Sequence, residues 1–213
     1  MLPAFYEAPL AYNFTMIVLF TSIGALYWRD WLYKLSLYPF GMWQGRELYR
    51  LFTSLFVHVG VLHLIANAFF GMVFIGEVEY MLVDDFGAVH GRLLLIVLII
   101  GIAGTAGSAS VYKHRHEYTH TSAGSSALIF GLVMFYLFYL PADKAVIDDS
   151  ELPSLYSYQL GMVYFAGVTA MAAFKIGKAA PIHWYGALAG GLLAMIIGLH
   201  HWQELAGFSP GAD

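Results

Sequence analysis

Gly124-Ser125-Ser126-Ala127 stands directly before a charge-free apolar run that extends over residues 128–140. Glycine and serine are typical of turns and helix starts, because glycine tolerates unusual backbone angles and serine can cap a first turn. A run this apolar is typical of a helix inside a lipid bilayer. The stretch therefore predicts a turn that delivers a serine to the first turn of a membrane helix.

The composition is that of an integral membrane protein. Of the 213 residues, 60% are hydrophobic and 11% are charged, with a mean hydropathy of +0.67, whereas a soluble domain carries about 25% charged residues. The formal net charge of -4 argues against a nucleic-acid partner. The absence of cysteine excludes disulfides, thiol catalysis and thiolate metal sites. The first residues lack a basic segment, so we expect no cleaved signal peptide.

Six apolar runs are separated by charged residues, and a spanning helix needs about 20 apolar residues. Lipid satisfies no backbone polar group, and the runs lack the polar-apolar alternation of a spanning strand. We therefore predict an all-α membrane protein in which residues 1–213 form a single domain, a bundle of six transmembrane helices. The predicted helices cover residues 8–28, 59–76, 93–112, 122–140, 155–174 and 181–200.

The connections between these runs differ in character. Residues 29–57 are too apolar for a solvated loop and too often interrupted by charge to span, so we expect short helices and turns in the membrane interface. Residues 142–154 are acidic and predict a solvated loop. The short polar connection before the fourth helix carries His114, His116 and His120. These histidines resemble a metal patch, but such a loop is more often simply polar, and we predict no metal site.

Three polar clusters are predicted to meet at one depth in the membrane. His63 and Asn67 lie in the first two turns of the second helix, Ser126 at the start of the fourth, and His183 at the start of the sixth. Helices that alternate across a membrane share a direction at every second position, so these three helix starts face the same side. At a rise of 1.5 Å per residue, each polar side chain lies roughly 3–12 Å inside its helix start.

The residue types in these clusters fit acyl transfer. A serine hydroxyl becomes a good nucleophile when a neutral imidazole takes its proton, so Ser126 is the candidate nucleophile and His183 the candidate base. A tetrahedral intermediate needs hydrogen-bond donors. His63 and Asn67 share a helix face by their i,i+4 spacing, and the amides at the start of the fourth helix add backbone donors. The predicted fourth and sixth helices contain no carboxylate, so we expect a Ser/His dyad.

Small residues predict a close contact between the fourth and sixth helices. Ala127 and Gly131 have i,i+4 spacing, as do Gly186 and Gly190, and Ala194 continues the second row. Rows of this kind let two membrane helices approach closely. If the two rows face each other, the histidine of the sixth helix reaches the serine of the fourth.

The chain resembles the rhomboid intramembrane serine proteases over most of its length, from residue 46 to residue 191. Each matching piece is short, but the order of the pieces and their positions on six helices are also similar to the family's core. The matching residues are Tyr49-Arg50-Leu51-Phe52-Thr53-Ser54-Leu55-Phe56-Val57-His58, His63-Leu64-Ile65-Ala66-Asn67, Gly76, Glu79, Gly124-Ser125-Ser126-Ala127, Gly131-Leu132, His183-Trp184-Tyr185-Gly186 and Gly190.

The resemblance implies chemical roles for four residues. It implies that Ser126 is the nucleophile and His183 the general base. It also implies that His63 and Asn67 line the oxyanion hole together with the Ser126 amide. The implied activity is an endopeptidase that cuts other membrane proteins in or near a transmembrane segment. The implied partners are transmembrane protein substrates and the lipid bilayer, and no metal or organic cofactor is implied.

The resemblance also implies structural roles. Arg50 and Glu79 are expected to pair and to brace the long first loop, which in this family is partly embedded in the membrane. Further small residues are expected to support the turn and the helix contact. These are Gly124, Ala127, Gly131, Gly186 and Gly190.

Two residues depart from the family's pattern. Ala127 stands where the family usually has glycine, so we expect the fourth and sixth helices to sit slightly further apart. Tyr49 replaces a tryptophan but keeps an amphipathic ring. Ala127 leaves open the alternative of a catalytically inactive rhomboid-like protein that binds transmembrane segments, although the serine and histidine are both present. A channel or transporter would show ionisable residues or a broken helix at mid-membrane, and we find no mid-membrane carboxylate.

Each candidate residue also has a purely structural interpretation. Ser126 could cap the fourth helix, although Ser122 and Ser125 are equally able caps. His63 and Asn67 could be interhelical hydrogen-bond partners. Their combination on three helix starts of the same direction favours catalysis.

Two arguments disagree on the orientation in the membrane. Lysine and arginine are more numerous on the side of the polar clusters, and the positive-inside rule then places that side in the cytoplasm. The resemblance to prokaryotic members implies the opposite, with the N-terminus inside. We adopt the family orientation and expect a multi-pass protein of a prokaryotic cell membrane.

Overall fold

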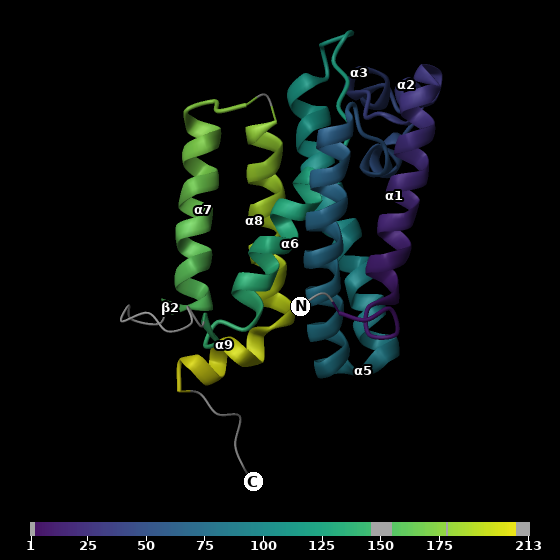
Figure 1. Cartoon of the computed structure of the whole chain (residues 1–213). Helices are drawn as coiled ribbons and strands as arrows, with labels where there is room; N and C mark the ends of the chain where they lie inside the picture. Colours follow the sequence, from purple (N-terminus) through teal and green to yellow (C-terminus); the bar gives the residue numbers. More distant parts are fainter. Residues whose placement is uncertain (1–2, 146–154, 178, 208–213) are drawn as a thin grey trace.

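Helices make up nearly all of the regular structure in the computed structural model, which describes residues 3–145, 155–177 and 179–207 (Figure 1). This confirms the mostly helical fold expected in lipid, where a helix satisfies its own backbone polar groups. The elements in chain order are α1 (Pro9–Tyr27), α2 (Arg29–Leu35), α3 (Pro39–Trp43), α4 (Arg50–Thr53), the 3-10 helix η1 (Ser54–Phe56), α5 (Val61–His114), α6 (Ser126–Tyr139), β1 (Lys144–Ala145), β2 (Leu155–Tyr156), α7 (Ser157–Ala173), α8 (Ala180–Ile197) and α9 (Leu199–Leu205).

Three of the described helices are long and apolar enough to cross a membrane. These are α1, α5 and α8, whereas α6 is apolar but shorter. Helix length and composition therefore support a membrane protein without establishing the predicted number of six spans.

Helix α5 contains a reversal that joins two of the predicted runs. Gly87 has non-helical angles, with φ 76° and ψ 164°. Arg92 forms an ion pair with Glu79 at 3.0 Å, although a separation of 13 positions would span about 20 Å of straight helix. The two halves of α5 therefore fold back on each other, as neighbouring rods in Figure 1 show. The predicted helix ends at residues 76 and 93 are corrected, because the charged stretch between them is helical except at Gly87.

The segment between α1 and α5 contains α2, α3, α4 and η1, joined by turns. This confirms the short helices and turns expected for residues 29–57. Figure 1 shows the segment gathered beside one end of α1.

Arg50 is 2% exposed and holds this segment together. Its guanidinium pairs with Glu47 at 3.1 Å and donates to two backbone carbonyl oxygens of the same segment. The expected Arg50–Glu79 pair is therefore wrong. Glu79 lies about five turns into α5, where it is 0% exposed, pairs with Arg92 and accepts the N–H of Ala11 at 3.0 Å. Each residue supports a different part of the fold.

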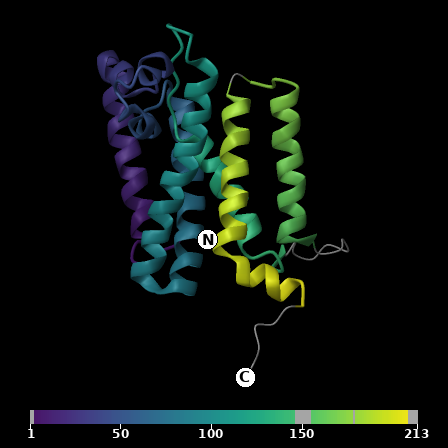
Figure 2. The same cartoon turned by 180° about the vertical axis from the view of Figure 1, so that it is seen from behind.

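Helix α6 lies against both α5 and α8, and most of its apolar side chains are buried. A Cβ atom on Gly186 would lie 2.1 Å from the carbonyl oxygen of Ala127, and one on Gly190 would lie 1.9 Å from that of Gly131. Only glycine permits this approach at positions 186 and 190, so the predicted contact between the two rows is confirmed. Figure 2 shows α8 (yellow) standing between α7 and the rest of the bundle.

The C-terminal part differs from the prediction in two details. The predicted helix at residues 181–200 is divided, since α8 ends at Ile197 and α9 begins after Gly198 and crosses the end of the bundle (Figure 1). Strands β1 and β2 form a short antiparallel pair at the base of the predicted acidic loop. Residues 146–154 of that loop lie outside the described residues.

Candidate active site

The hydroxyl oxygen of Ser126 lies 2.9 Å from Nε2 of His183. Ser126 is the first residue of α6, and His183 lies in the first turn of α8. The backbone contact between Ala127 and Gly186 brings these two helix starts together. The distance is that of a hydrogen bond. A serine hydroxyl that is hydrogen-bonded to an imidazole nitrogen can give its proton to that nitrogen.

Ser125, and not Ser126, occupies the cap position of α6. It makes no side-chain capping hydrogen bond. Its hydroxyl is buried and has no hydrogen-bond partner among the described residues. The structure therefore does not give Ser126 the role of a helix cap, and Ser125 lacks the neighbouring base that Ser126 has.

The turn before α6 requires glycine at position 124, two residues before the helix begins at Ser126. Gly124 has φ +121°, which L side chains rarely adopt, and a Cβ atom there would lie 2.7 Å from Cε1 of His63. The Gly124 N–H donates to the carbonyl oxygen of Ser54 at 2.8 Å, and Ser122 pairs with Leu37 through two backbone hydrogen bonds. The turn is thus fixed to the segment between α1 and α5.

The imidazole of His183 is oriented by an aromatic ring. It stacks on Phe130 with a centroid distance of 4.2 Å and an interplanar angle of 8°. Its Nδ1 is buried and has no hydrogen-bond partner in the part of the chain that the structure describes. Among the described residues, the serine and the histidine thus form a contacting pair in which the histidine ring is held by its stacking on Phe130.

His63 and Asn67 lie on the first two turns of α5, next to the same site. The His63 ring borders the turn at Gly124. Asn67 is 6% exposed, and its amide donates to the His63 carbonyl oxygen at 2.8 Å. An asparagine amide carries a second N–H group. Asn67 and Ser126 line one cavity of about 150 Å³ between α5 and α6, so the structure brings all four predicted residues to one place.

A second cavity, of about 70 Å³, opens on both Ser126 and His183. Its walls come from the segment before α5, the turn before α6 and the start of α8, and they include Ser54, Gly124 and Ile182. A cavity of this size has room for a few water molecules. The serine therefore borders a space large enough for water although the surrounding helices are apolar.

His58 is a residue of the site to which sequence analysis assigned no role. It is 0% exposed, and its Nε2 accepts the Ser125 N–H at 3.4 Å. Its Nδ1 lies 2.9 Å from the hydroxyl of Ser22 on α1, which donates to the Phe56 carbonyl oxygen at 3.0 Å. The neutral Nδ1–H tautomer satisfies all of these contacts. The signals in the sequence were its place at the end of the matching stretch Tyr49–His58 and shortly before His63, and neither reveals these partners.

The three histidines of the connection before α6, for which we predicted no metal site, lie only partly together. Nδ1 of His114 lies 2.9 Å from Glu117, and Nδ1 of His120 lies 3.5 Å from the same carboxylate. Burial lowers the pKa of His120 below its ordinary value. His116 is exposed and takes no part. Neither of the two candidate cation clusters among the described residues includes a residue of the Ser/His pair.

The rhomboid domain family matches residues 45–204, which include the whole site. "Putative rhomboid protease YdcA" of Bacillus subtilis (strain 168) is 28% identical over 181 residues, covering 84% of this chain and 81% of that protein. "RHOMBOID-like protein 6, mitochondrial" of Arabidopsis thaliana is 31% identical over 112 residues, covering 53% of this chain. "Inactive rhomboid protein 1" of Drosophila melanogaster is 36% identical over 87 residues, covering 41% of this chain.

These relatives differ in length and in the activity that their names state. The chain spans only 5% of the fly protein and 29% of the plant protein. One relative is named as a protease and another as inactive. The similarity therefore shows the family but does not decide between an active and an inactive member, and this question depends on the residues of the site. The match over most of the chain shows that it belongs to the rhomboid family.

Proposed function

We propose that this chain is an intramembrane serine endopeptidase, in which Ser126 and His183 hydrolyse peptide bonds in or near transmembrane segments of other membrane proteins. The observation that carries the proposal is the 2.9 Å contact between the serine hydroxyl and Nε2 of the imidazole. Two cavities that reach Ser126 support it, because a substrate carbonyl and a water molecule both need space there. The family acts on membrane proteins in the bilayer, which supports this substrate class.

The first half of the reaction forms an acyl-enzyme. Oγ of Ser126 attacks the carbonyl carbon of the scissile bond while its proton moves to Nε2 of His183. An Oγ–C bond forms, and the carbonyl oxygen becomes an oxyanion. When the C–N bond breaks, the imidazolium gives its proton to the nitrogen of the departing peptide. The amine product leaves, and the acyl group remains on the serine.

The oxyanion needs hydrogen-bond donors that are already in place. We assign this role to the side chains of His63 and Asn67 and to the backbone amide of Ser126. The first N–H groups of α6 have no acceptor within the helix, and the positive end of the helix dipole favours a negative charge there. Loss of one such donor typically slows the reaction by about 10²–10³-fold.

The second half of the reaction regenerates the enzyme. A water molecule in the cavity beside the pair gives a proton to Nε2 of His183 and attacks the acyl carbon. The new C–O bond forms, the bond from the carbon to Oγ of Ser126 breaks, and the imidazolium returns its proton to the serine. The acid product leaves. No metal or cofactor takes part in this sequence of steps.

Several residues are proposed to support the site without reacting. Gly124 provides the turn, and Arg50 and Glu79 hold different segments in place through their own ion pairs. The remaining support comes from the backbone contact of α6 with α8. This contact is formed by Ala127, Gly131, Gly186 and Gly190.

We further propose six spans, formed by α1, the two halves of α5, α6, α7 and α8. The chain is then a multi-pass protein of a prokaryotic cell membrane, with the site on the outer side. The bacterial relative that aligns over 81% of its own length supports this assignment. The excess of basic residues on the site side is the observation that opposes it.

A second candidate function is that of a catalytically inactive protein that binds transmembrane segments. The observation in its favour is the 36% identity to a fly protein named as inactive. Its prediction is that the chain holds membrane segments at the same site without cutting them. The chain keeps both Ser126 and His183 at hydrogen-bond distance, and this favours the protease.

The test is cleavage of a panel of single-span membrane proteins in liposomes. The native chain is compared with Ser126→Ala and His183→Ala, and with Ser125→Ala as a matched control one residue away. Cleavage by the native chain and by the control, abolished in the other two, supports the proposal. Cleavage by Ser126→Ala at the native rate would exclude this nucleophile. Binding of the panel without any cleavage by the folded native chain would favour the inactive alternative.

A further inference from the structure

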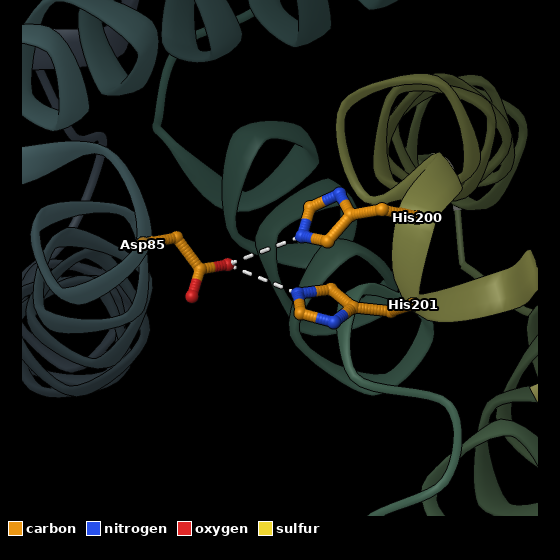
Figure 3. Close-up of side chains that lie close together, drawn as sticks. All are labelled: Asp85, His200 and His201. Carbon is orange, nitrogen blue, oxygen red and sulfur yellow. Dashed lines mark hydrogen bonds and ion pairs between the residues drawn. The ribbon is translucent and has the colours of Figure 1, made fainter. Parts of the chain in front are cut away.

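A second cluster of polar side chains lies at the end of the bundle away from the Ser/His pair. Nε2 of His201 is 3.0 Å from Oδ2 of Asp85, and Nε2 of His200 is 3.9 Å from the same oxygen. Figure 3 shows both rings directing these nitrogens at one carboxylate. The rise of a helix places His200 about 25 Å along the chain from His183. The proposed hydrolysis makes no use of these residues.

We propose that Asp85, His200 and His201 form a binding site for a divalent transition-metal cation, with Zn²⁺ as the best match. Two imidazoles and one carboxylate are a donor set typical of this ion. Bonds of about 2.0–2.2 Å in a tetrahedron hold the donor atoms about 3.3 Å apart. The observed separations of 3.0 Å and 3.9 Å lie on either side of this value. The fourth position is left for water.

The carboxylate is already oriented by a neighbour that would act as an outer-shell partner. The hydroxyl of Tyr139 on α6 donates to Oδ2 of Asp85 at 2.5 Å, and the Tyr139 side chain is 0% exposed. Metal-bound carboxylates in proteins are usually held by such hydrogen bonds. The cluster therefore has its ligand atoms from α5 and α9 and its support from α6.

The ring geometry separates this cluster from the other candidate on the chain. The rings of His114 and His120 are stacked at 3.7 Å with an interplanar angle of 5°, so their lone pairs lie in nearly parallel planes and do not converge on one ion. The rings of His200 and His201 are inclined by 42°, and both direct Nε2 at Asp85. The cluster at Asp85 is the better cation site for this reason.

A bound ion would connect two places where the helices change direction. Asp85 lies just before the reversal at Gly87, and His200 and His201 lie in the first turn of α9, directly after α8 ends. The ion would tie α9 to the reversal of α5 and thereby hold the end of α8 opposite the Ser/His pair. The role is structural, so ion binding is expected to raise the unfolding temperature.

The experiment uses the full chain in detergent, purified without a polyhistidine tag and stripped with a chelator. Titration with Co²⁺ reports a four-coordinate site by visible absorption bands, and Zn²⁺ affinity follows from competition. We expect one equivalent bound. Asp85→Asn and His201→Ala should each weaken binding by at least about 10-fold, and Tyr139→Phe by about 10-fold. Matched controls are His90→Ala, an exposed histidine near the same reversal, and His120→Ala in the other cluster.

Each result decides the proposal. Loss of the Co²⁺ bands in the Asp85 and His201 variants, with retention in both controls, supports it. An increase in unfolding temperature with Zn²⁺ in the native chain and in His120→Ala, but not in Asp85→Asn, supports it independently. Absence of binding by the native chain at millimolar Co²⁺ would overturn it and leave the cluster as an ion pair. Binding that only His120→Ala removes would also overturn it.

Discussion

A Cβ atom on Gly186 would lie 2.1 Å from the carbonyl oxygen of Ala127, so the backbones of α8 and α6 are in contact where the Ser/His pair forms. The same relationship recurs one turn later between Gly190 and Gly131, at 1.9 Å. Alanine after the serine therefore does not prevent the contact, because it is the carbonyl oxygen of Ala127 that faces Gly186. The geometry of the proposed nucleophile and base depends on this contact between two helix starts.

Gly186→Leu is expected to unfold or inactivate the chain. Overpacking usually costs about 1–3 kcal/mol, and a clash with backbone cannot be relieved by a change of rotamer, so we expect at least about 3 kcal/mol. Thermal unfolding and substrate cleavage measure the effect. Gly167→Leu on α7 is the matched control, since no atom lies within 4 Å of its Cβ position. Full stability and activity of Gly186→Leu would contradict the contact.

Gly124→Ala is expected to lower activity by displacing the turn that carries the serine. A φ of +121° is one that L side chains rarely adopt and costs an alanine about 1–3 kcal/mol, and its Cβ would press on the His63 ring at 2.7 Å. Gly60→Ala is the control, because its φ of -160° suits any residue and its Cβ position is open. Cleavage rate and unfolding temperature should both fall for the first variant and stay near native for the second. Equal behaviour of the two variants would refute the role of the turn.

His58→Ala is expected to destabilise the start of α6. The substitution leaves the buried N–H of Ser125 without its acceptor, and an unsatisfied buried group costs about 1–3 kcal/mol. It also removes the hydrogen bond to Ser22, whose hydroxyl keeps its bond to the Phe56 carbonyl oxygen. The measurement is chemical or thermal unfolding, followed by cleavage. His116→Ala, an exposed histidine, serves as the comparison. A native unfolding temperature for His58→Ala would show that this hydrogen-bond chain has no structural role.

Two double-mutant cycles test the ion pairs that the structure shows in place of the expected Arg50–Glu79 pair. Glu79→Gln and Arg92→Met are expected to couple by about 0.5–3 kcal/mol in unfolding free energy, because the two side chains are in contact at 3.0 Å. Glu79→Gln and Arg50→Met are expected to add within about 0.5 kcal/mol, since they belong to separate pairs. Strong coupling in the second cycle would restore the pairing expected from the sequence.

The meeting of Ser126 and His183 could be predicted because helix direction follows from counting apolar runs. Once the runs are helices, Ser126 and His183 must face the same side, and the small residues on both helices indicate which faces meet. The i,i+4 spacing placed His63 and Asn67 on one face in the same way. These inferences use only periodicity and direction, which a sequence expresses directly.

Partners across the fold could not be predicted in this way. Glu79 meets Arg92 because the chain reverses at Gly87. The charge of residues 77–92 indicated a loop between two helices, whereas these residues continue both helices up to the reversal. His58 meets Ser125 because the turn before α6 is hydrogen-bonded to the segment that follows α1. Such contacts depend on tertiary packing, which no local pattern specifies.

The measurement that tests the central claim most directly is labelling of the native chain with a fluorophosphonate, which reacts with activated serines and needs no knowledge of the substrate. The labelled residue is identified by mass spectrometry. We predict a single adduct on Ser126, absent in His183→Ala and retained in Ser125→Ala. An unlabelled native chain that is shown to be folded, or an adduct on Ser125, would contradict the account.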